Sequence, residues 1–433
     1  MIKYLTHSGK WLLSHKDWTA HLTFAIGGIA VGLVATFMAY SSEWAHHLLQ
    51  STITVSPYLP FIISPLGLIL VVWLTRRYFP GSEGSGIPQV MAALEMGQEK
   101  ERSVLLTLRI AFGKVLLCTI GMLSGASIGR EGPTVHIGAS IMFSLRRFVR
   151  FRIYDMERVL ILAGGSAGVA AAFNTPLAGI VFGIEELSRS FEVRTRGLLL
   201  TGVMVAAITA IAIQGNYTYF GSTSAVIDIY SSIVPVLMCG VVGGIIGGGF
   251  SLVLIRGNQL VSPFRNNKPF VVAAICGLSI AIIGYYSGHV TYGTGYAEAK
   301  SLVTDAGELG SDYAYLKLLA TVVSYLSGIP GGIFAPSLAI GAGLGSHIAE
   351  WFTAYPHGAL VLFGMVGYFS GVVQAPITAF VIVLEMTDQH ELIVPLMVTA
   401  FIGTAVSKSI CKTPIYCTLA DSFRADDKKL HNK

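Results

Sequence analysis

The chain has 433 residues, of which 53% are hydrophobic and only 12% are charged, and its formal net charge is +5. Soluble globular proteins carry about 25% charged residues, so this composition excludes an ordinary soluble domain and predicts an integral membrane protein in a lipid bilayer. The small net charge for this length gives no sign of a nucleic-acid-binding surface, and we expect no nucleic-acid partner.

Apolar segments recur along the chain from about residue 22 to residue 410. A helix that spans a bilayer needs about 20 apolar residues, but several of these segments are shorter or are interrupted by Gly and Pro. Such interruptions are expected where irregular backbone lines a buried site. The sequence therefore predicts an all-α polytopic membrane protein with tilted, partly broken helices. The segments include residues 22–40, 61–74, 159–184, 198–213, 234–255, 270–286, 360–384 and 392–406.

Both ends of the chain are polar and contain lysines, at positions 3, 10 and 16 and at positions 428, 429 and 433. The N-terminal lead lacks the compact apolar core of a signal peptide. Because basic residues favour the cytoplasmic side of a membrane, we expect both termini to be short cytoplasmic tails. Neither tail is long enough for a further folded domain, so we expect residues 1–433 to form a single transmembrane domain without a cytoplasmic regulatory domain.

The five cysteines lie in or beside apolar segments, without the spacing of a metal site. We therefore expect buried thiols, no disulfide framework, no metal and no cofactor. They are Cys118, Cys239, Cys276, Cys411 and Cys417.

Three Gly- and Pro-rich motifs interrupt the apolar pattern. In chain order they are Gly84-Ser85-Gly86-Ile87-Pro88, Gly129-Arg130-Glu131-Gly132-Pro133 and Gly331-Gly332-Ile333-Phe334-Ala335-Pro336. Each puts flexible backbone immediately before the start of a helix, where free N–H groups and the helix dipole favour an anion. If the three helix starts converge, they make an anion site without a full positive charge, from which an anion can still be released. Ordinary helix packing is the alternative, and three such motifs together make it the weaker one.

The second motif also carries ionisable groups to membrane depth. Arg130 and Glu131 stand side by side between two hydrophobic stretches. Ionisable groups at this depth are costly, and by default they mark an ion or proton pathway. The motif therefore predicts that an anion and an acid share one place.

Two parts of the sequence resemble each other. The residues that recur at an offset of 203 are Ser124, Gly125, Gly129, Pro133, Ile137, Gly138 and Ala139, and those that recur at an offset of 200 include Pro176, Val181 and Glu185. We therefore predict two structural repeats, about residues 20–225 and 226–420, with a boundary in the polar stretch 215–232. In transporters such repeats are often inverted, and the site lies between them near the membrane midplane.

These features together resemble the CLC family of chloride channels and chloride/proton antiporters, in its bacterial form. The three motifs match that family's signature stretches in order and spacing. Residues 174–179 with the following Glu185 and Glu186, residues 384–388, and Tyr416 match as well. The resemblance covers about residues 25 to 420. It implies the fold of that family with two inverted repeats, a homodimer with one pore per subunit, and a place in the bacterial inner membrane.

The resemblance also implies an anion site. The hydroxyl groups of Ser85 and Tyr416 and the backbone N–H groups of Ile333 and Phe334 are expected to hold the central anion. Backbone groups near Gly86 and Gly132 are assigned to the same anion-binding set. Serine at position 85 favours chloride, because relatives that prefer nitrate tend to have proline there, and fluoride exporters lack this form of the motif.

Two glutamates are expected to carry protons. Glu131 is the expected gate, whose carboxylate competes with an anion for the outer site and leaves when it is protonated. Glu186 is expected to relay protons between the cytoplasm and Glu131. Glu185 and its repeat partner Glu385 are expected to be structural, and His136 is expected to be packed and neutral. The predicted function is secondary active exchange of chloride for protons by a transporter, not an enzyme.

Two alternatives stay open. The first is a passive chloride channel of the same fold, which Glu186 disfavours because channels of this family tend to lack a glutamate there. The second is an intramembrane hydrolase with Ser166 as nucleophile, since residues 164–168 match the G-x-S-x-G pattern. That pattern needs a strand before it and a helix after it, whereas the small residues here favour close helix packing.

Overall fold

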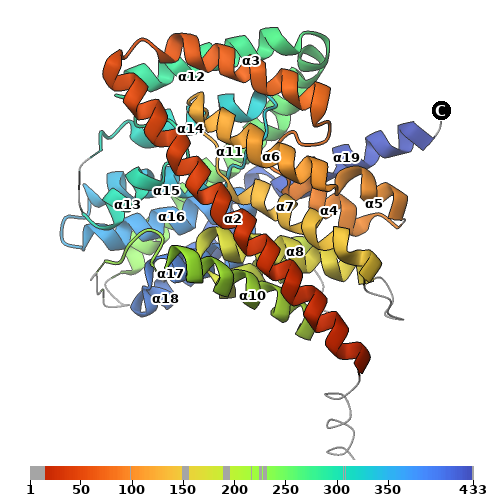
Figure 1. Cartoon of the computed structure of the whole chain (residues 1–433). Helices are drawn as coiled ribbons and strands as arrows, with labels where there is room; N and C mark the ends of the chain where they lie inside the picture. The colour runs from red at the N-terminus through yellow and green to blue at the C-terminus, as the bar shows by residue number, and fades with distance from the viewer. Residues whose placement is uncertain are drawn as a thin grey trace, which may run out of the picture.

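The computed structural model describes residues 15–97, 99–148, 156–188, 196–215, 217–223, 227, 232–305, 307 and 309–431 (Figure 1). This part of the chain is helical with connecting turns, and its only β-type pairings are two isolated bridges. Eight of its helices are long and apolar enough to cross a membrane. The protein is therefore an integral membrane protein with an all-α polytopic fold, as the sequence predicts.

The helices of the first half of the chain are α2 His15–Val55, α3 Pro60–Tyr78, α4 Ile87–Glu95, α5 Glu99–Leu105, α6 Leu108–Leu123, α7 Glu131–Ser144, α8 Met156–Phe173, α9 Pro176–Phe182 and α10 Arg196–Gln214. Those of the second half are α11 Ile233–Asn267, α12 Pro269–Tyr286, α13 Tyr296–Val303, α14 Tyr313–Leu326, α15 Phe334–Ala349, α16 His357–Val373, α17 Pro376–Thr387, α18 Ile393–Ile410 and α19 Ile415–His431.

Two apolar segments that look continuous in the sequence are each broken into two helices. Residues 159–184 contain the end of α8 and the start of α9, and residues 360–384 contain the end of α16 and the start of α17. The backbone φ angle is +60° at Asn174 and +58° at Gln374. This left-handed conformation ends a right-handed helix. A proline then begins the next helix at its first position, where the missing N–H costs nothing.

Helix packing is similar in the two halves. Helix α7 packs against α8 as α15 packs against α16, and α2 packs against α10 as α11 packs against α18. Matching helices of the two halves also contact each other, namely α3 with α12, α7 with α15, and α9 with α17. This arrangement is that of two structural repeats meeting face to face, with α7 and α15 at their contact.

Two glutamates join the repeats. The Glu185 carboxylate, just beyond the C-terminal end of α9, accepts hydrogen bonds from the N–H groups of Ile377 and Thr378 at 3.1 and 2.6 Å, at the start of α17. The Glu385 carboxylate, near the C-terminal end of α17, accepts two from the start of α9 at 3.1 and 2.8 Å. Helices α9 and α17 therefore run antiparallel, as inverted repeats require. These four hydrogen bonds support the structural role expected for both glutamates.

The boundary between the halves lies between Gln214, the last residue of α10, and Ile233, the first residue of α11. This agrees with the predicted stretch 215–232, of which residues 216, 224–226 and 228–231 lie outside the described part. The predicted limits of the two repeats stay a prediction.

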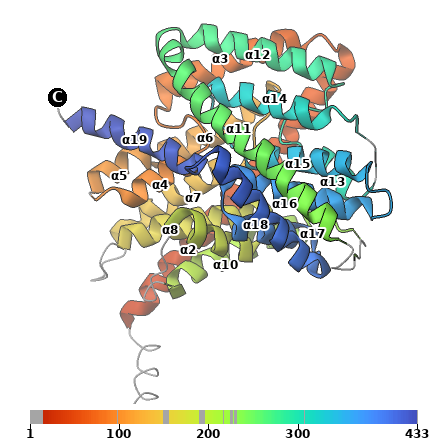
Figure 2. The same ribbon diagram turned by 180° about the vertical axis from the view of Figure 1, so that it is seen from behind.

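Helices α13 and α19 lie at opposite ends of the molecule in both views, and α2 begins on the side of α19 (Figures 1 and 2). Both ends of the described chain thus point to one side. Residues 1–14 lie outside the described part, and the cytoplasmic position of the termini stays a prediction.

Candidate anion and proton site

The three Gly- and Pro-rich motifs meet through their backbones. The Gly129 N–H donates to the Gly332 carbonyl at 2.6 Å, and the Gly332 N–H donates back at 2.8 Å. The Gly84 N–H donates to the Ile329 carbonyl at 3.3 Å, and the Gly331 N–H donates to the Gly84 carbonyl at 3.2 Å. Helices α4, α7 and α15 therefore begin close together, as the sequence predicts.

Ser85 lies between the starts of α4 and α7. Its hydroxyl is buried and has no hydrogen-bond partner among the described residues. A Cβ atom at Gly132 would lie 2.2 Å from the Ser85 Oγ. Gly86 has a φ angle of +105°, and a Cβ atom there would lie 3.0 Å from the Gly132 carbonyl. Glycine at both positions lets the two loops approach, and an unused hydroxyl donor suits a weakly held anion.

Glu131 is the first residue of α7, and its side chain is fully buried. Its Oε2 accepts a hydrogen bond from the backbone N–H of Ala335 at 3.4 Å, in the first turn of α15. Its Oε1 lies 4.0 Å from the Nε of Arg130. The carboxylate therefore occupies the N-terminal end of α15, where free N–H groups favour a negative charge.

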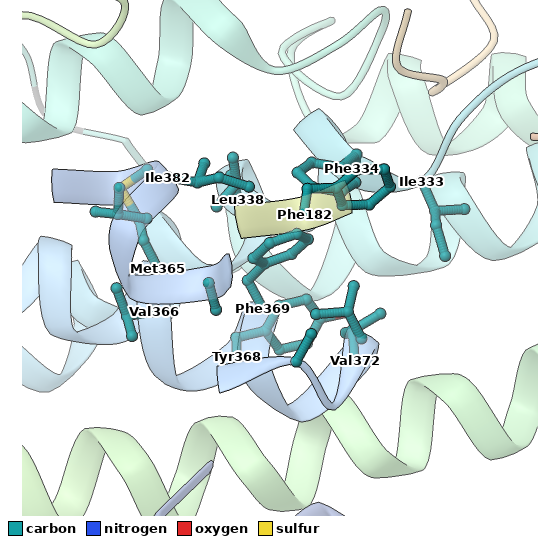
Figure 3. Close-up of a cluster of buried hydrophobic side chains, with 14 of the residues drawn as sticks. Phe182, Ile333, Phe334, Leu338, Met365, Val366, Tyr368, Phe369, Val372 and Ile382 are labelled. Atoms are coloured by element: carbon teal, nitrogen blue, oxygen red, sulfur yellow. The ribbon is translucent and has the colours of Figure 1, made fainter. Parts of the chain in front are cut away.

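Ile333 and Phe334 form the start of α15, which has no side-chain cap. The Phe334 ring packs against Phe369, with ring centroids 4.3 Å apart, and against Phe182 at 6.2 Å (Figure 3). This apolar cluster fixes the helix start within the core. The backbone N–H groups of Ile333 and Phe334 consequently belong to a rigid, buried helix end.

Tyr416 is the second residue of α19, a helix that packs against α4. Its hydroxyl is buried and, within the described ranges, has no hydrogen-bond partner. The carboxyl groups of Glu186 and Glu131 both lie within electrostatic range of this hydroxyl. Tyr416 therefore belongs to the surroundings of both predicted proton-transfer glutamates.

Glu186 lies on the π-helical segment Gly183–Ser188 that continues α9, and only 3% of its surface is exposed. The segment contacts α4, α8 and α17. In it Glu185 reaches the start of α17, while Glu186 stays buried. Short π-helical turns are frequent at functional sites. The structure thus places the two adjacent glutamates in different surroundings, with Glu185 at the start of α17 and Glu186 in the interior.

A buried lysine lies beside Ser85, so the prediction of an anion site without a full positive charge is wrong for its immediate surroundings. Lys114 of α6 is fully buried, and its Nζ donates to the Gly84 carbonyl at 2.9 Å. The same Nζ would lie 3.2 Å from a Cβ atom at Gly86. A positive charge so close to the Gly84-Ser85-Gly86 loop favours an anion at Ser85. The available signal was a lysine interrupting an otherwise apolar helix.

Two cavities approach the site from different sides. One of about 240 Å³ is lined by Ser85 and by residues of α19 such as Leu419. The other, of about 430 Å³, is lined by Arg130, by His46 of α2 and by the start of α13. Because α13 and α19 lie at opposite ends of the molecule (Figures 1 and 2), the cavities lead to Ser85 and to Arg130 from opposite sides.

Two further residues singled out in the sequence are Ser166, which lies within α8, and His136, which packs against the Gly86 loop. Ser166 is buried within the single helix α8, where no strand precedes it, and no partner for its hydroxyl exists among the described residues. The hydrolase interpretation is therefore wrong, because the nucleophile turn and the general base are both missing there. His136 is buried, with its Nε2 2.8 Å from the Leu105 carbonyl, and is packed as expected.

The chain is similar to known transport proteins over nearly its whole length. Residues 66–408 match the family model described as voltage gated chloride channel. An H(+)/Cl(-) exchange transporter ClcA of Citrobacter koseri is 30% identical over 430 residues, covering 92% of this chain and 87% of that protein. A protein of the same name from Yersinia pseudotuberculosis is 29% identical, covering 91% of this chain and 86% of that protein.

Solved structures have the same fold. A slow cyanobacterial Cl-/H+ antiporter matches with a TM-score of 0.82 and 25% identity, over 94% of this chain and 98% of that one. A CLC-type fluoride/proton antiporter matches with a TM-score of 0.80 and 22% identity, over 93% of this chain and 98% of that one. With the family model covering most of its length, the chain belongs to the voltage-gated chloride channel family, the CLC family, and has the fold of that family.

Proposed function

We propose that this protein is a secondary active transporter that exchanges chloride for protons across the membrane. The observation that carries the proposal is the hydrogen bond between the Glu131 carboxylate and the Ala335 N–H at the start of α15. A carboxylate and a chloride ion have the same charge and need the same donors, so they compete for this place. The relatives named as H(+)/Cl(-) exchange transporters support exchange.

Chloride is held, in this account, by the hydroxyl groups of Ser85 and Tyr416 and by the N–H groups of Ile333 and Phe334. Backbone near Gly86 and Gly132 completes the site. Hydroxyl and amide donors bind a halide without a directly coordinating charge, so release stays fast. The buried ammonium group of Lys114 donates a hydrogen bond to the Gly84 carbonyl. Its positive charge attracts an anion bound at Ser85.

Proton coupling follows from the charge of Glu131. When the carboxylate is ionised it occupies the end of α15 and excludes an anion. When it is protonated it loses the charge that held it there, and an anion takes its place. Burial opposes the charged form of a carboxyl group, so the proton and the anion arrive together. Exchange follows if this proton then leaves Glu131 toward the side from which the chloride came, so that chloride moves one way and the proton the other.

Glu186 is the proposed route for protons from the α19 side. It is buried, and both it and Glu131 lie within electrostatic range of the Tyr416 hydroxyl. The rival function is a passive chloride channel of the same fold. Passive conduction needs no second buried acid, and a buried ionisable group is costly unless it is used, so Glu186 supports exchange.

The protein is a transporter, and chloride and protons are its cargo. We propose that it works as a homodimer with one pore per subunit, in the bacterial inner membrane, with both termini cytoplasmic. Both ends of the described chain point to one side (Figures 1 and 2), which is compatible with that orientation.

Calorimetry of the purified protein tests whether acid and anion share one place. Chloride that displaces the Glu131 carboxylate should promote its protonation, so chloride binding should take up protons. The binding enthalpy should then depend on the ionisation enthalpy of the buffer, and Glu131→Gln should bind chloride without this dependence. Chloride binding by the unmodified protein without proton uptake, across the pH range in which it is folded, would contradict the proposal.

A further inference from the structure

A second buried lysine occupies in the second repeat the position that Lys114 occupies in the first. Lys317 of α14 follows Lys114 at an offset of 203, the offset that relates the second and third motifs. Its side chain is fully buried. Its Nζ donates to the carbonyls of Thr291, Tyr292 and Gly293 at 2.9, 3.4 and 2.8 Å. An ammonium group has three donors, and all three have acceptors here.

The loops that the two lysines hold are also alike. Gly84-Ser85-Gly86 precedes α4, and Gly293-Thr294-Gly295 precedes α13. The glycines of the first loop have φ angles of +66° and +105°, and those of the second have +66° and +79°. Lys114 donates to the first carbonyl of its loop, and Lys317 donates to the first carbonyl of the other. The same lysine-held loop therefore occurs once in each repeat.

The hydroxyl group in the middle of each loop is used differently. That of Ser85 has no hydrogen-bond partner in the described part of the chain. The Oγ1 of Thr294 accepts a hydrogen bond from the N–H of Tyr296 at 3.2 Å and so caps the start of α13. The first loop thus offers a donor to an anion. The second keeps the backbone geometry and uses its hydroxyl oxygen to fix its own helix.

The second loop forms a wall of the 430 Å³ cavity that reaches Arg130. Gly293, Thr294 and Gly295 all line this cavity. Lys317 stands behind the wall, because a Cβ atom at Gly295 would lie 3.0 Å from the Lys317 Cε. A substitution that moves or neutralises Lys317 should therefore alter this wall of the cavity and leave the Glu131 side chain unaltered.

The charges around this cavity give Lys317 a second use. Two glutamates, Glu43 and Glu298, line it together with Arg130. Carboxylates on the path of an anion repel it. Glu298 lies in the first turn of α13, directly after the loop that Lys317 holds, and the two opposite charges attract each other. The buried ammonium group thus offsets one of the two negative charges that face an incoming anion.

We propose that Lys317 is a positioning residue for the anion entrance on the α13 side of the protein. It holds the loop of residues 291–295 as the wall of the cavity in front of Arg130, and it offsets the charge of Glu298. The inference rests on the proposed chloride exchange. It assigns side-specific chloride affinity to Lys317 and leaves proton coupling to other residues.

The test measures chloride affinity from each side in proteoliposomes of a single orientation, checked by protease access to a C-terminal tag. Uptake of labelled chloride gives the KM on each side in turn. In Lys317→Met, the KM from the α13 side should rise by about threefold to tenfold, because an entering anion loses the attraction of one positive charge in a partly screened site. The KM from the α19 side and the ratio of protons to chloride should stay unchanged. Lys317→Arg, which keeps the charge, should restore part of the affinity.

A second variant moves the same loop without altering the lysine. A Cβ atom at Gly295 would lie 2.5 Å from the Cβ of Ala339, so Gly295→Ala should reproduce the one-sided rise in KM. Gly288→Ala is the matched control. Gly288 also has a φ angle of +66°, but a Cβ atom there meets nothing within 4 Å, so its KM values should equal those of the unmodified protein.

Equal changes in KM on both sides, or unchanged KM from the α13 side in Lys317→Met, would overturn the inference. If Lys317→Met does not fold, the KM values of Gly295→Ala on the two sides test the inference by the same criteria. Failure of the unmodified protein to move protons with chloride would count against the proposed function instead, so the two failures are distinct.

Discussion

The Glu131 carboxylate and the Ala335 backbone N–H lie 3.4 Å apart, although they belong to different halves of the chain. The contact places an acidic side chain of the first repeat at the N-terminal end of α15 in the second. A helix end of this kind attracts any small anion. Whether an anion or the side chain occupies it is therefore decided by the charge of one carboxyl group.

Replacing Glu131 by alanine removes the competitor and leaves the donors in place. We expect Glu131→Ala to reduce chloride-driven proton flux to the leak of empty vesicles while chloride flux persists. Glu350→Ala is a suitable control, because that side chain is 59% exposed. Proton movement that persists in Glu131→Ala would sink the assignment of Glu131 as the gate.

Glu186→Gln tests the proton route from the α19 side. The amide keeps the size of the side chain but cannot ionise, so proton transport should be lost while chloride flux remains. Flux of both ions is measured in the same vesicles. A proton rate equal to that of the unmodified protein would mean that the relay lies elsewhere.

Glu185→Gln provides a contrast one position away. Glu185 accepts two hydrogen bonds from the start of α17, and hydrogen bonds to a charged group contribute about 1.5–3 kcal/mol each. We expect a lower Tm in detergent and an unchanged ratio of protons to chloride. The structural role would be refuted by a normal Tm together with altered coupling.

Ser85→Pro tests selectivity at the central site. The substitution removes the only side-chain donor of this loop and should shift the preference from chloride toward nitrate. The ratio of nitrate to chloride flux, measured under equal gradients, reports the change. An unchanged ratio would show that Ser85 does not set the selectivity.

Gly132→Ala tests the close approach of α7 to Ser85. A Cβ atom at position 132 would lie 2.2 Å from the Ser85 Oγ, so the hydroxyl must move away from the anion. Loss of one hydrogen bond of about 1–1.5 kcal/mol predicts a chloride affinity about fivefold to tenfold weaker in calorimetry. Gly249→Ala, where a Cβ atom meets nothing within 4 Å, should bind as the unmodified protein does. Equal affinities in all three would contradict the arrangement.

The helix start after each of the three motifs was predictable because it depends on local residues, whereas their convergence entered the sequence analysis only as a condition for an anion site. Prolines near the three helix starts, and in the first motif glycines with positive φ angles, shape the local backbone without help from distant residues. The membrane class and the helical fold were predictable from the composition and from the recurring apolar segments. The breaks at Asn174 and Gln374 were harder to predict, because neither residue demands a left-handed conformation in isolation.

The partners of polar side chains were not predictable, since they join segments far apart in the sequence. Nothing local shows that Glu185 reaches α17 while Glu186 stays buried. Lys317 was not predictable from the sequence repeat, because the two loops and the two lysines have different offsets. The loop at residues 293–295 follows the first loop at an offset of 209, whereas the lysines are related by an offset of 203. Ser85 and Thr294 differ in function only through contacts that the folded chain makes.

Proton flux driven by chloride shows whether this protein couples the movement of the two ions. Purified protein is reconstituted into liposomes with a chloride gradient, the voltage is clamped with potassium and valinomycin, and the proton concentration inside is recorded. Protons should move uphill as chloride runs down its gradient. Chloride flux without coupled proton movement would contradict the proposed exchange and would make this protein a passive chloride channel.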